Sequence, residues 1–425
     1  MLRFLGGALL PRDDQLTLAE CPIRSNTYVE VVGRLLGGVE VTIFGRQHKI
    51  DDAGGLNFRN MRIGPAEIKE VATFLMTPAS AALNSVTIDG NPIGYPSGAS
   101  VKPGAETGVA VKKGAFAAVD GRFGEVVYLN GSSSKIRWLD DGSMSAYIKN
   151  DKLTSVVASR TDLIEDYSHI RSLGEALSGS KVHTYGLANC NFTPATLTTF
   201  VESVRWAHAA LNSLKCANNP GMVGELEYGE LKTPDAHAEV FKQLTDNLKT
   251  SQVTEADFSS CGLGPVALGH LSEWVRDAEA ALNSVTVDGN PIGYPSATLK
   301  PGAVTGIEVK KGVFAAVDGR FGEVTQDPDR DSEVKLRWLD DGSEGQFGRR
   351  PYIKTDKLTS VVASRTDLIE DYSHIRSLGE ALSGSKVQTY GFANCNFNPV
   401  SLATFVESVR WADAGGQRGS ELPQG

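Results

Sequence analysis

Apolar residues recur along most of the chain in two alternating patterns. Short runs in which every second residue is apolar predict strands with one buried face. Longer stretches with apolar residues three and four positions apart predict amphipathic helices. Several of these stretches follow a proline, which is tolerated at a helix start. The predicted helices span residues 66–75, 166–177, 197–207, 236–248, 266–275 and 371–382.

The predicted strands share one frame, Leu-x-x-Leu-x-Leu-x-x-Asn/Cys-x-Leu, in which other apolar residues often replace leucine. Successive frames are about 28 residues apart, enough for one unit of strand, turn and helix. Two far longer gaps, from Leu83 to Val182 and from Leu282 to Val387, interrupt this spacing. The good matches begin at Leu83, Val182, Leu211, Val253, Leu282 and Val387, and a degenerate one begins at Leu56.

This frame resembles the leucine-rich repeat family, in the helix-containing form known from ribonuclease inhibitor. The resemblance implies an α/β solenoid with parallel strands on a concave face and helices outside. It also implies that the Asn or Cys of each frame satisfies backbone groups inside the turn, so that Cys190, Cys261 and Cys395 are buried structural thiols. Cys216 falls on a core strand position. The outward residues expected to form a protein-binding face are Asn84, Thr87, Asp89, His183, Lys215, Glu255, Asp257, Thr286, Asp288 and Gln388.

The long gaps come from a duplicated unit. Residues 151–182 recur letter for letter as residues 356–387, and the stretch 83–93 recurs as 282–292 with one change. In each copy the strand precedes the gap and the helix follows it, which predicts a small domain inserted between them. Paired β runs joined through Asp120-Gly121, and a second turn at Asp141-Gly142, predict four or five short strands in a small closed barrel.

The insert resembles the Tudor and SH3-like barrel class. That class reads methylated lysine or arginine through an aromatic cage, and both inserts contain suitable aromatic residues. The favoured interpretation is that these residues form the core of a very small barrel, and a ligand cage is the alternative. The second insert has extra residues at 344–351, so its rim must differ. The aromatic residues are Phe116, Phe123, Trp138 and Tyr147, with copies Phe314, Phe321, Trp338 and Tyr352.

The first 38 residues resemble the second half of ubiquitin. The similarity lies in the segments 2–9, 16–20 and 27–32 and in the ending Arg34-Leu-Leu-Gly37-Gly38. The family's first hairpin and long helix have no counterpart here, and Arg3 replaces an apolar residue of its recognition patch. We therefore expect a partial domain, with cleavage after Gly38 as a less favoured alternative.

These patterns divide the chain into seven segments. We predict a partial ubiquitin-like domain, leucine-rich repeats interrupted by two barrels, and a disordered tail. The segments are the partial ubiquitin-like domain over residues 1–38, first repeats 39–94, first barrel 95–160, central repeats 161–293, second barrel 294–365, last repeat 366–414 and tail 415–425.

Composition and charge narrow the classes of function. Hydrophobic residues are 41% and charged residues 22% of the chain, as in folded soluble proteins. A net charge of −9 with scattered basic residues argues against nucleic acid or an anionic membrane as the main partner. No apolar run approaches the roughly 20 residues of a membrane span. Five cysteines, an odd number without metal spacing, indicate reduced thiols in a cytoplasmic protein, with the nucleus as the alternative.

The sequence offers no recognisable catalytic motif. The segment 174–181 mimics a phosphate-binding loop but lacks the Gly-Lys-Ser/Thr order. The histidines show no metal spacing, and Asp140-Asp141 is expected to be a solvated turn. We therefore expect a non-catalytic scaffold without cofactor or metal that binds proteins or peptides of basic character. The alternatives are a ubiquitin-pathway adaptor and a methylated-peptide reader, and an enzyme would need an activity that no visible residue predicts.

Overall fold

A computed structural model describes residues 3–4, 29–30, 40–227, 230–317, 320–339, 342, 344 and 352–410. At the N-terminus, β1 (Arg3–Phe4) pairs antiparallel with β2 (Val29–Glu30). The other residues of the ubiquitin-like stretch, including Gly37 and Gly38, and the predicted tail 415–425 lie outside the described residues.

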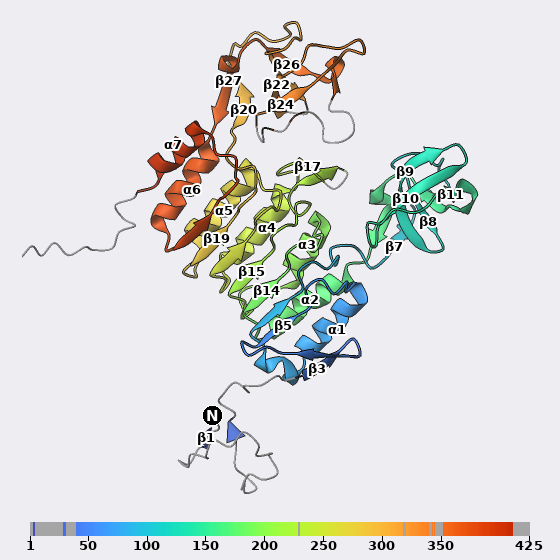
Figure 1. The fold of residues 1–425 in the computed structure, drawn as a ribbon, viewed down its shortest axis with the longest axis vertical. Coiled ribbons are helices and arrows are strands. Elements are labelled where there is room, and N and C mark those ends of the chain that lie inside the picture. Colours follow the sequence, from blue (N-terminus) through green and yellow to red (C-terminus); the bar gives the residue numbers. More distant parts are fainter. Residues whose placement is uncertain are drawn as a thin grey trace, which may run out of the picture.

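The main body is a parallel sheet of seven short strands in the order β28-β19-β18-β15-β14-β6-β5. Figure 1 shows helices packed along one side of this sheet. The strands are β5 (Gly55–Asn57), β6 (Ser85–Thr87), β14 (Thr184–Gly186), β15 (Ser213–Lys215), β18 (Glu255–Asp257), β19 (Ser284–Thr286) and β28 (Thr389–Gly391). The helices are α1 (Pro65–Leu75), η1 (Pro78–Ala82), α2 (Ser168–Gly179), α3 (Pro194–Ser203), α4 (Ala238–Leu248), α5 (Pro265–Asp277), α6 (Ser373–Gly384) and α7 (Pro399–Ser408). The predicted α/β class is confirmed, and the predicted helices begin or end within a few residues of the observed ones.

The sheet and helices enclose one continuous apolar core. The middle residue of each strand, such as Val86, Leu214 or Val285, is directed into this core, and its two neighbours are directed away. Each α-helix contacts the next one along the chain, from α1 to α7. A single unit of strand and helix cannot bury its apolar face alone, so stacking supplies the cover.

Buried asparagine and cysteine side chains alternate along the turns that follow the strands. The Asn219 side-chain carbonyl accepts the backbone N–H groups of Cys190 and Phe192 at 2.9 and 3.0 Å. Its amide donates to the carbonyls of Leu187 and Cys216 at 2.9 and 2.7 Å. Asn91 and Asn290 form similar sets of bonds. The thiols of Cys190, Cys261 and Cys395 donate to backbone carbonyls instead. These side chains satisfy turn groups that no strand reaches.

A β-hairpin covers the N-terminal end of the stack. Strands β3 (Glu40–Ile43) and β4 (Arg46–Lys49) pair antiparallel and bury Val41 and Ile43. The turn residues Phe44 and Gly45 both have positive φ, 56° and 64°, as a tight two-residue hairpin turn requires.

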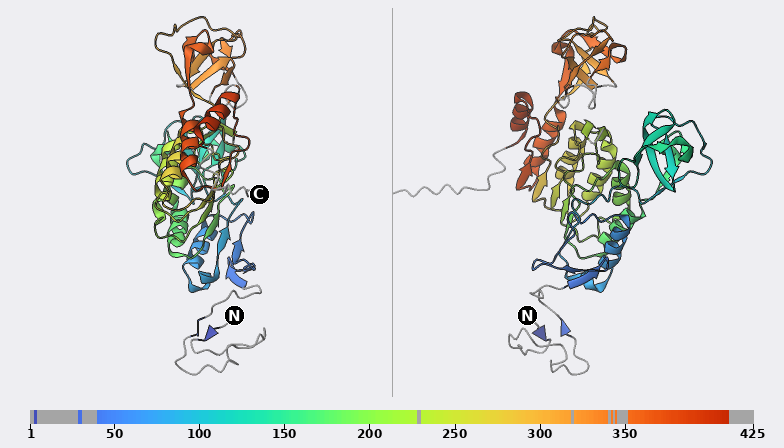
Figure 2. Two further views of the ribbon diagram at one scale, coloured as in Figure 1. Left: turned by 90° about the vertical axis from the view of Figure 1, so that its left-hand side faces the viewer. Right: turned by 45° about the vertical axis from the view of Figure 1, so that its right-hand side comes forward.

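Each insert is joined to the main body by a pair of antiparallel strands and carries a curled antiparallel sheet. The right-hand view of Figure 2 shows both inserts projecting from the main body. In the first insert the sheet order is β11-β10-β9-β8-β12. Its outermost strands, β11 and β12, are not paired with each other, so the sheet is a half-barrel and not the closed barrel we expected. The first insert comprises β7 (Ala99–Val101), β8 (Phe116–Val119), β9 (Arg122–Asn130), β10 (Ser133–Trp138), β11 (Ile148–Lys149), η2 (Asn150–Lys152), β12 (Thr154–Val157), η3 (Arg160–Asp162) and β13 (Leu163–Glu165).

The second insert repeats this arrangement in its described residues. Its joining strands are β20 and β27, its larger sheet has the order β24-β22-β21-β26, and β23 pairs with β25. Its elements are β20 (Ser296–Leu299), β21 (Phe314–Val317), β22 (Arg320–Val324), β23 (Glu333–Val334), β24 (Leu336–Trp338), β25 (Ile353–Lys354), η4 (Thr355–Lys357), β26 (Thr359–Val362), η5 (Arg365–Asp367) and β27 (Leu368–Asp371). Among the described residues, no helix is long and apolar enough to cross a membrane.

Candidate functional site

The first candidate surface is the side of the parallel sheet that faces away from the helices, here called the sheet face. Because the strands are in register, the residues on either side of each buried middle residue form two rows across seven strands. One row includes Ser85, Ser213 and Glu255, and the other includes Thr87, Lys215 and Asp257. Six inter-strand spacings make these rows about 29 Å wide.

The ten predicted surface residues occupy three positions relative to these rows. Thr87, Lys215, Asp257 and Thr286 share one row, and Glu255 lies in the other. Asn84, His183 and Gln388 are exposed where the strands begin, and there His183 Nδ1 lies 3.0 Å from Asn84 Oδ1. Asp89 and Asp288 follow the strands at their other end.

Three of the acidic residues on this surface accept hydrogen bonds from backbone N–H groups. Asp89 accepts the Ala188 N–H at 2.9 Å and an ion pair from Arg59 at 2.7 Å. Asp288 accepts the Ala393 N–H at 2.7 Å. Asp257 accepts the N–H of Ser259 at 3.0 Å. These carboxylates therefore stabilise turns as well as adding negative charge, and replacing them tests folding together with binding. Lys215 and Glu255 are exposed and make no ion pair among the described residues.

The predicted aromatic residues of the inserts do not form one cage. Phe116 and Phe123 are buried in an apolar cluster on one side of their sheet, whereas Trp138 packs against a separate cluster. Tyr147 is exposed. In the second insert Phe314 and Phe321 are again buried together, apart from buried Trp338, and Tyr352 is half-buried. The four phenylalanines are therefore largely buried within their inserts.

The tryptophan and tyrosine of each insert have a cationic side chain of the same chain over one face of the ring. Arg122 lies over Trp138 at 4.5 Å, and Lys135 lies over Tyr147 at 4.9 Å. Asp140 and Asp141 hold the Arg122 guanidinium at 2.6 and 3.1 Å. The second insert repeats both stacks, with Arg320 over Trp338 at 4.6 Å and Lys335 over Tyr352 at 5.0 Å. These four ring faces are occupied by cations of the protein itself.

The second candidate surface lies beside the first insert. A cavity of about 890 Å³ is lined by side chains of the insert, by Tyr95 and Pro96 at its base, and by Leu226 of a hairpin. This hairpin, β16 (Glu225–Glu227) and β17 (Glu230–Thr233), belongs to the main body and follows β15. Among the predicted aromatic residues, Phe116, Trp138 and Tyr147 line this cavity and Phe123 does not.

The sequence pattern did not identify several residues of this cavity, namely Tyr95, Tyr128, Met144 and Leu226. A usable signal was present, because the two copies of the insert differ at Tyr128 and Met144, where the second has Gln326 and Glu344.

The hairpin also contacts the second insert. The Arg320 guanidinium donates to the Lys232 carbonyl at 3.2 Å. A smaller cavity of about 190 Å³ lies there, lined by Asp235 and Pro265 of the main body and by Phe321 and Leu339 of the insert. The two inserts follow β6 and β19, each two strands away from β15 in the sheet. Their attachment points are therefore about 19 Å apart along one edge of the sheet.

Burial lowers the reactivity of the described cysteine thiols. It raises the pKa of Cys190 to about 12 and that of Cys395 to about 11, and it also raises the pKa of Cys216 and Cys261. A thiol with so high a pKa is a poor nucleophile at neutral pH.

Two equivalent histidines, one at the base of each insert, contact backbone carbonyls. His169 Nε2 lies 2.9 Å from the Ile93 carbonyl, and His374 Nε2 lies 3.0 Å from the Ile292 carbonyl. Burial lowers the pKa of both imidazoles. Within the described part of the chain, no group of three or more His, Cys, Asp or Glu residues could hold a metal ion.

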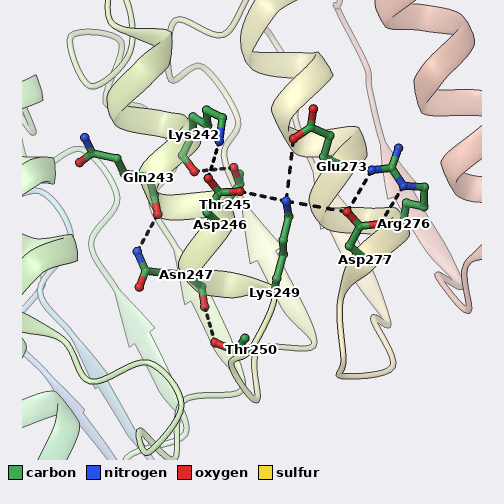
Figure 3. Close-up of polar contacts among 10 residues, drawn as sticks. All are labelled: Lys242, Gln243, Thr245, Asp246, Asn247, Lys249, Thr250, Glu273, Arg276 and Asp277. Atoms are coloured by element: carbon green, nitrogen blue, oxygen red, sulfur yellow. Dashed lines mark hydrogen bonds and ion pairs between the residues drawn. The ribbon is translucent and has the colours of Figure 1, made fainter.

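The helix side of the main body carries a network of compensated charges, shown in Figure 3. Lys242 pairs with Asp246 one turn later on α4, at 2.5 Å. Lys249 Nζ lies 2.9 Å from Asp246 and 3.8 Å from Glu273 and Asp277 of α5, and so connects the two helices. Arg276 in turn pairs with Asp277 at 2.7 Å. Because these pairs are exposed, they add little to stability, and their charges leave no marked excess of either sign.

Searches against models of protein families and against curated proteins found nothing that matches this chain. Its family is therefore not identified. The structure shows an α/β protein with a seven-stranded parallel sheet, helices packed together on one side, and curled antiparallel half-barrel inserts.

Proposed function

We propose that the chain is a non-catalytic protein–protein interaction scaffold of the leucine-rich-repeat kind. The observation that carries this proposal is the sheet face, where two rows of outward residues extend across seven strands in register. The buried middle residues fix the backbone, so exposed outward residues such as Lys215 and Glu255 can change without cost to the core. A surface about 29 Å wide suits another protein or a peptide better than a small molecule, which needs a concave and largely enclosing pocket.

The charges of the sheet face favour a partner with a basic surface. Glu255 and Asp257 lie on one strand beside Lys215 of the next, and Asp288 adds negative charge where its strand ends, whereas the carboxylate of Asp89 is paired with Arg59. Exposed charges of this kind act mainly on association rate and partner choice. We therefore expect binding to weaken as ionic strength rises.

A non-catalytic role is supported by the burial of the cysteine and histidine side chains that could otherwise take part in catalysis. The described cysteines have raised pKa values because they are buried. His169 and His374 are buried against backbone carbonyls at the bases of the inserts. A methylated-peptide reader is less favoured, because Arg122 and Lys135 already lie over the accessible rings of the first insert. The ubiquitin-pathway adaptor depends largely on residues outside the described stretches of the chain.

The test compares two charge swaps that leave net charge unchanged. The sheet-face variant is Lys215→Glu with Glu255→Lys. Its matched control on the helix side is Arg171→Glu with Glu175→Arg on α2, two exposed residues that make no ion pair among the described residues. Proteins captured from a lysate of the source organism are quantified by mass spectrometry for wild type and both variants. The proposal predicts a discrete set of partners lost with the sheet-face swap and retained with the helix swap. Partners unaffected by the sheet-face swap would contradict it.

A further inference from the structure

We propose that the cavity between the first insert and the β16–β17 hairpin is a docking site for an extended acidic peptide segment that also carries apolar side chains. This inference rests on the proposed scaffold function and names a second surface through which it operates. It concerns the first insert alone, because the second lacks the residues that make the site.

Large apolar side chains are exposed together around this cavity. Tyr128 and Met144 are each 50% exposed, Tyr147 is 52% exposed, and Leu226 of the hairpin is 40% exposed. All four line the same cavity of about 890 Å³. Isolated exposed apolar residues are ordinary, but a group of them around one recess marks a surface that another molecule covers. Tyrosine and methionine are also enriched in protein interfaces.

The charges around the cavity favour an acidic occupant. Lys135, Arg137 and Arg160 line it, and among the described lining residues Glu125 is the one carboxylate. Arg160 is paired with Glu165 at 2.7 Å, and Arg137 lies 3.9 Å from Glu125. The Lys135 ammonium lies over the Tyr147 ring, and Lys135 makes no ion pair with a carboxylate of the described residues. A carboxylate of the partner would therefore meet an uncompensated cation beside an apolar surface.

The second insert provides an internal comparison. It retains the buried phenylalanines, the tryptophan and both cation–ring stacks. However, it has Gln326 in place of Tyr128 and Glu344 in place of Met144, and Glu344 pairs with Arg337 at 2.8 Å. The same fold is thus compatible with polar residues at both positions. The apolar pair in the first insert is not required for folding, which leaves binding as its role.

Contacts at the base hold the first insert against the main body. The Tyr95 hydroxyl accepts a hydrogen bond from Asn191 Nδ2 at 2.8 Å, which ties the insert's first segment to a turn of the stack. Gly142, with φ of 70°, lies so close to Tyr95 that a Cβ there would clash with the ring. The cavity wall is therefore fixed before a ligand arrives, which reduces the entropy cost of binding.

The experiment selects random peptides from a phage-displayed library on the immobilised full chain. Enriched peptides are then measured by fluorescence anisotropy against wild type and against Tyr128→Gln with Met144→Glu, the residues of the second insert. The reciprocal pair on the second insert, Gln326→Tyr with Glu344→Met, is the matched control. We expect peptides with acidic and aromatic or aliphatic residues, an affinity lower by about tenfold or more for the first variant, and no change for the control. Unchanged thermal unfolding of both variants shows that folding is intact.

Other outcomes separate this inference from the scaffold function. Peptides that bind the Tyr128→Gln, Met144→Glu variant with wild-type affinity, but lose affinity with the Lys215→Glu, Glu255→Lys swap, overturn the docking site and support the sheet face. Enrichment of basic peptides overturns the stated chemistry of the partner. A selection that enriches no peptide also overturns the docking site, and the protein capture experiment then decides the scaffold function separately.

Discussion

Helices α2 and α6 have the same amino-acid sequence and different surroundings. Both begin with Ser-His-Ile and belong to the duplicated stretch, but α2 packs between α1 and α3, whereas α6 packs between α5 and the last described helix, α7. Leu177 of α2 is fully buried, while its copy Leu382 is only half-buried. Identical residues therefore contribute differently to stability, and position in the stack decides how much. The first two predictions each compare two copies of one residue whose surroundings differ.

The largest expected effect concerns the buried asparagines. Asn290, on the turn after β19, makes four backbone hydrogen bonds within about 3 Å, and its copy Asn91, on the turn after β6, makes three such bonds. Because β19 and β6 each lie one strand in from an end of the sheet, the number of bonds distinguishes the two copies. Replacing either with alanine leaves buried N–H and C=O groups without partners. We expect Asn290→Ala to lower the free energy of unfolding by about 4 kcal/mol and Asn91→Ala by about 3 kcal/mol. Urea denaturation followed by circular dichroism measures both, and an equal or reversed loss would contradict the account.

A smaller effect is expected for the leucine pair. Leu177→Ala removes a fully buried side chain between neighbouring helices, so we expect a loss of about 3 kcal/mol in unfolding free energy. Leu382→Ala removes a half-buried one, for which we expect about 1 kcal/mol. Because the local sequences are identical, helix propensity cancels in the comparison. Equal losses of unfolding free energy at the two positions would show that the neighbouring helices do not determine how much each leucine contributes to stability.

The two buried histidines are expected to make stability depend on pH. Because burial lowers the pKa of His169 and His374 in the folded chain, the unfolded chain binds protons first as pH falls. Their effect on stability therefore appears as pH drops below the ordinary histidine pKa of about 6.5. Glutamine can place its amide Nε2 donor near the position of the histidine Nε2, toward the Ile93 and Ile292 carbonyls, and it does not titrate. We expect the double variant His169→Gln, His374→Gln to lose less stability than wild type between about pH 7.5 and 5.5. The measurement is the temperature of thermal unfolding at each pH. An equal fall of this temperature in the variant and in wild type would contradict the prediction.

The smallest effect is an order of labelling among the cysteines. All four described thiols are buried, but Cys395 lies on the turn after β28, the outermost strand of the sheet, and Cys261 lies in the interior. Terminal units open more often than central ones in a stacked repeat. In a Cys21→Ser background, we expect Cys395 to react first with a thiol reagent and Cys261 among the last. Peptide mapping by mass spectrometry gives the order, and early labelling of Cys261 would contradict it.

Much of the main body was predictable from the sequence because its pattern repeats. The resemblance to leucine-rich repeats implied that the side chains at Asn91, Cys190 and Cys261 satisfy backbone groups inside the turns, and the structure confirms those bonds. The duplication also located the inserts. In each copy the strand of the repeat comes before the long gap and the helix comes after it, so the residues between them form the insert.

The cavity was not predictable because its parts are distant in the sequence. Leu226 reaches it from a hairpin that follows β15, whereas Tyr128 and Met144 belong to an insert that follows β6. Sequence patterns report which residues are buried within an element, but not which elements meet across a surface. The open half-barrel was missed for a related reason, since closure depends on whether the outermost strands β11 and β12 meet.

The most direct test of the scaffold proposal compares two lysines in one labelling experiment. Lys215 is on the sheet face, and Lys242 is on the helix side (Figure 3). The chain is treated with an acetylating reagent, alone and in complex with a captured partner, and modification of each lysine is measured by mass spectrometry. The proposal predicts that the partner protects Lys215 and leaves Lys242 as reactive as before. Protection of Lys242 with Lys215 unchanged would place the partner on the helices and contradict it.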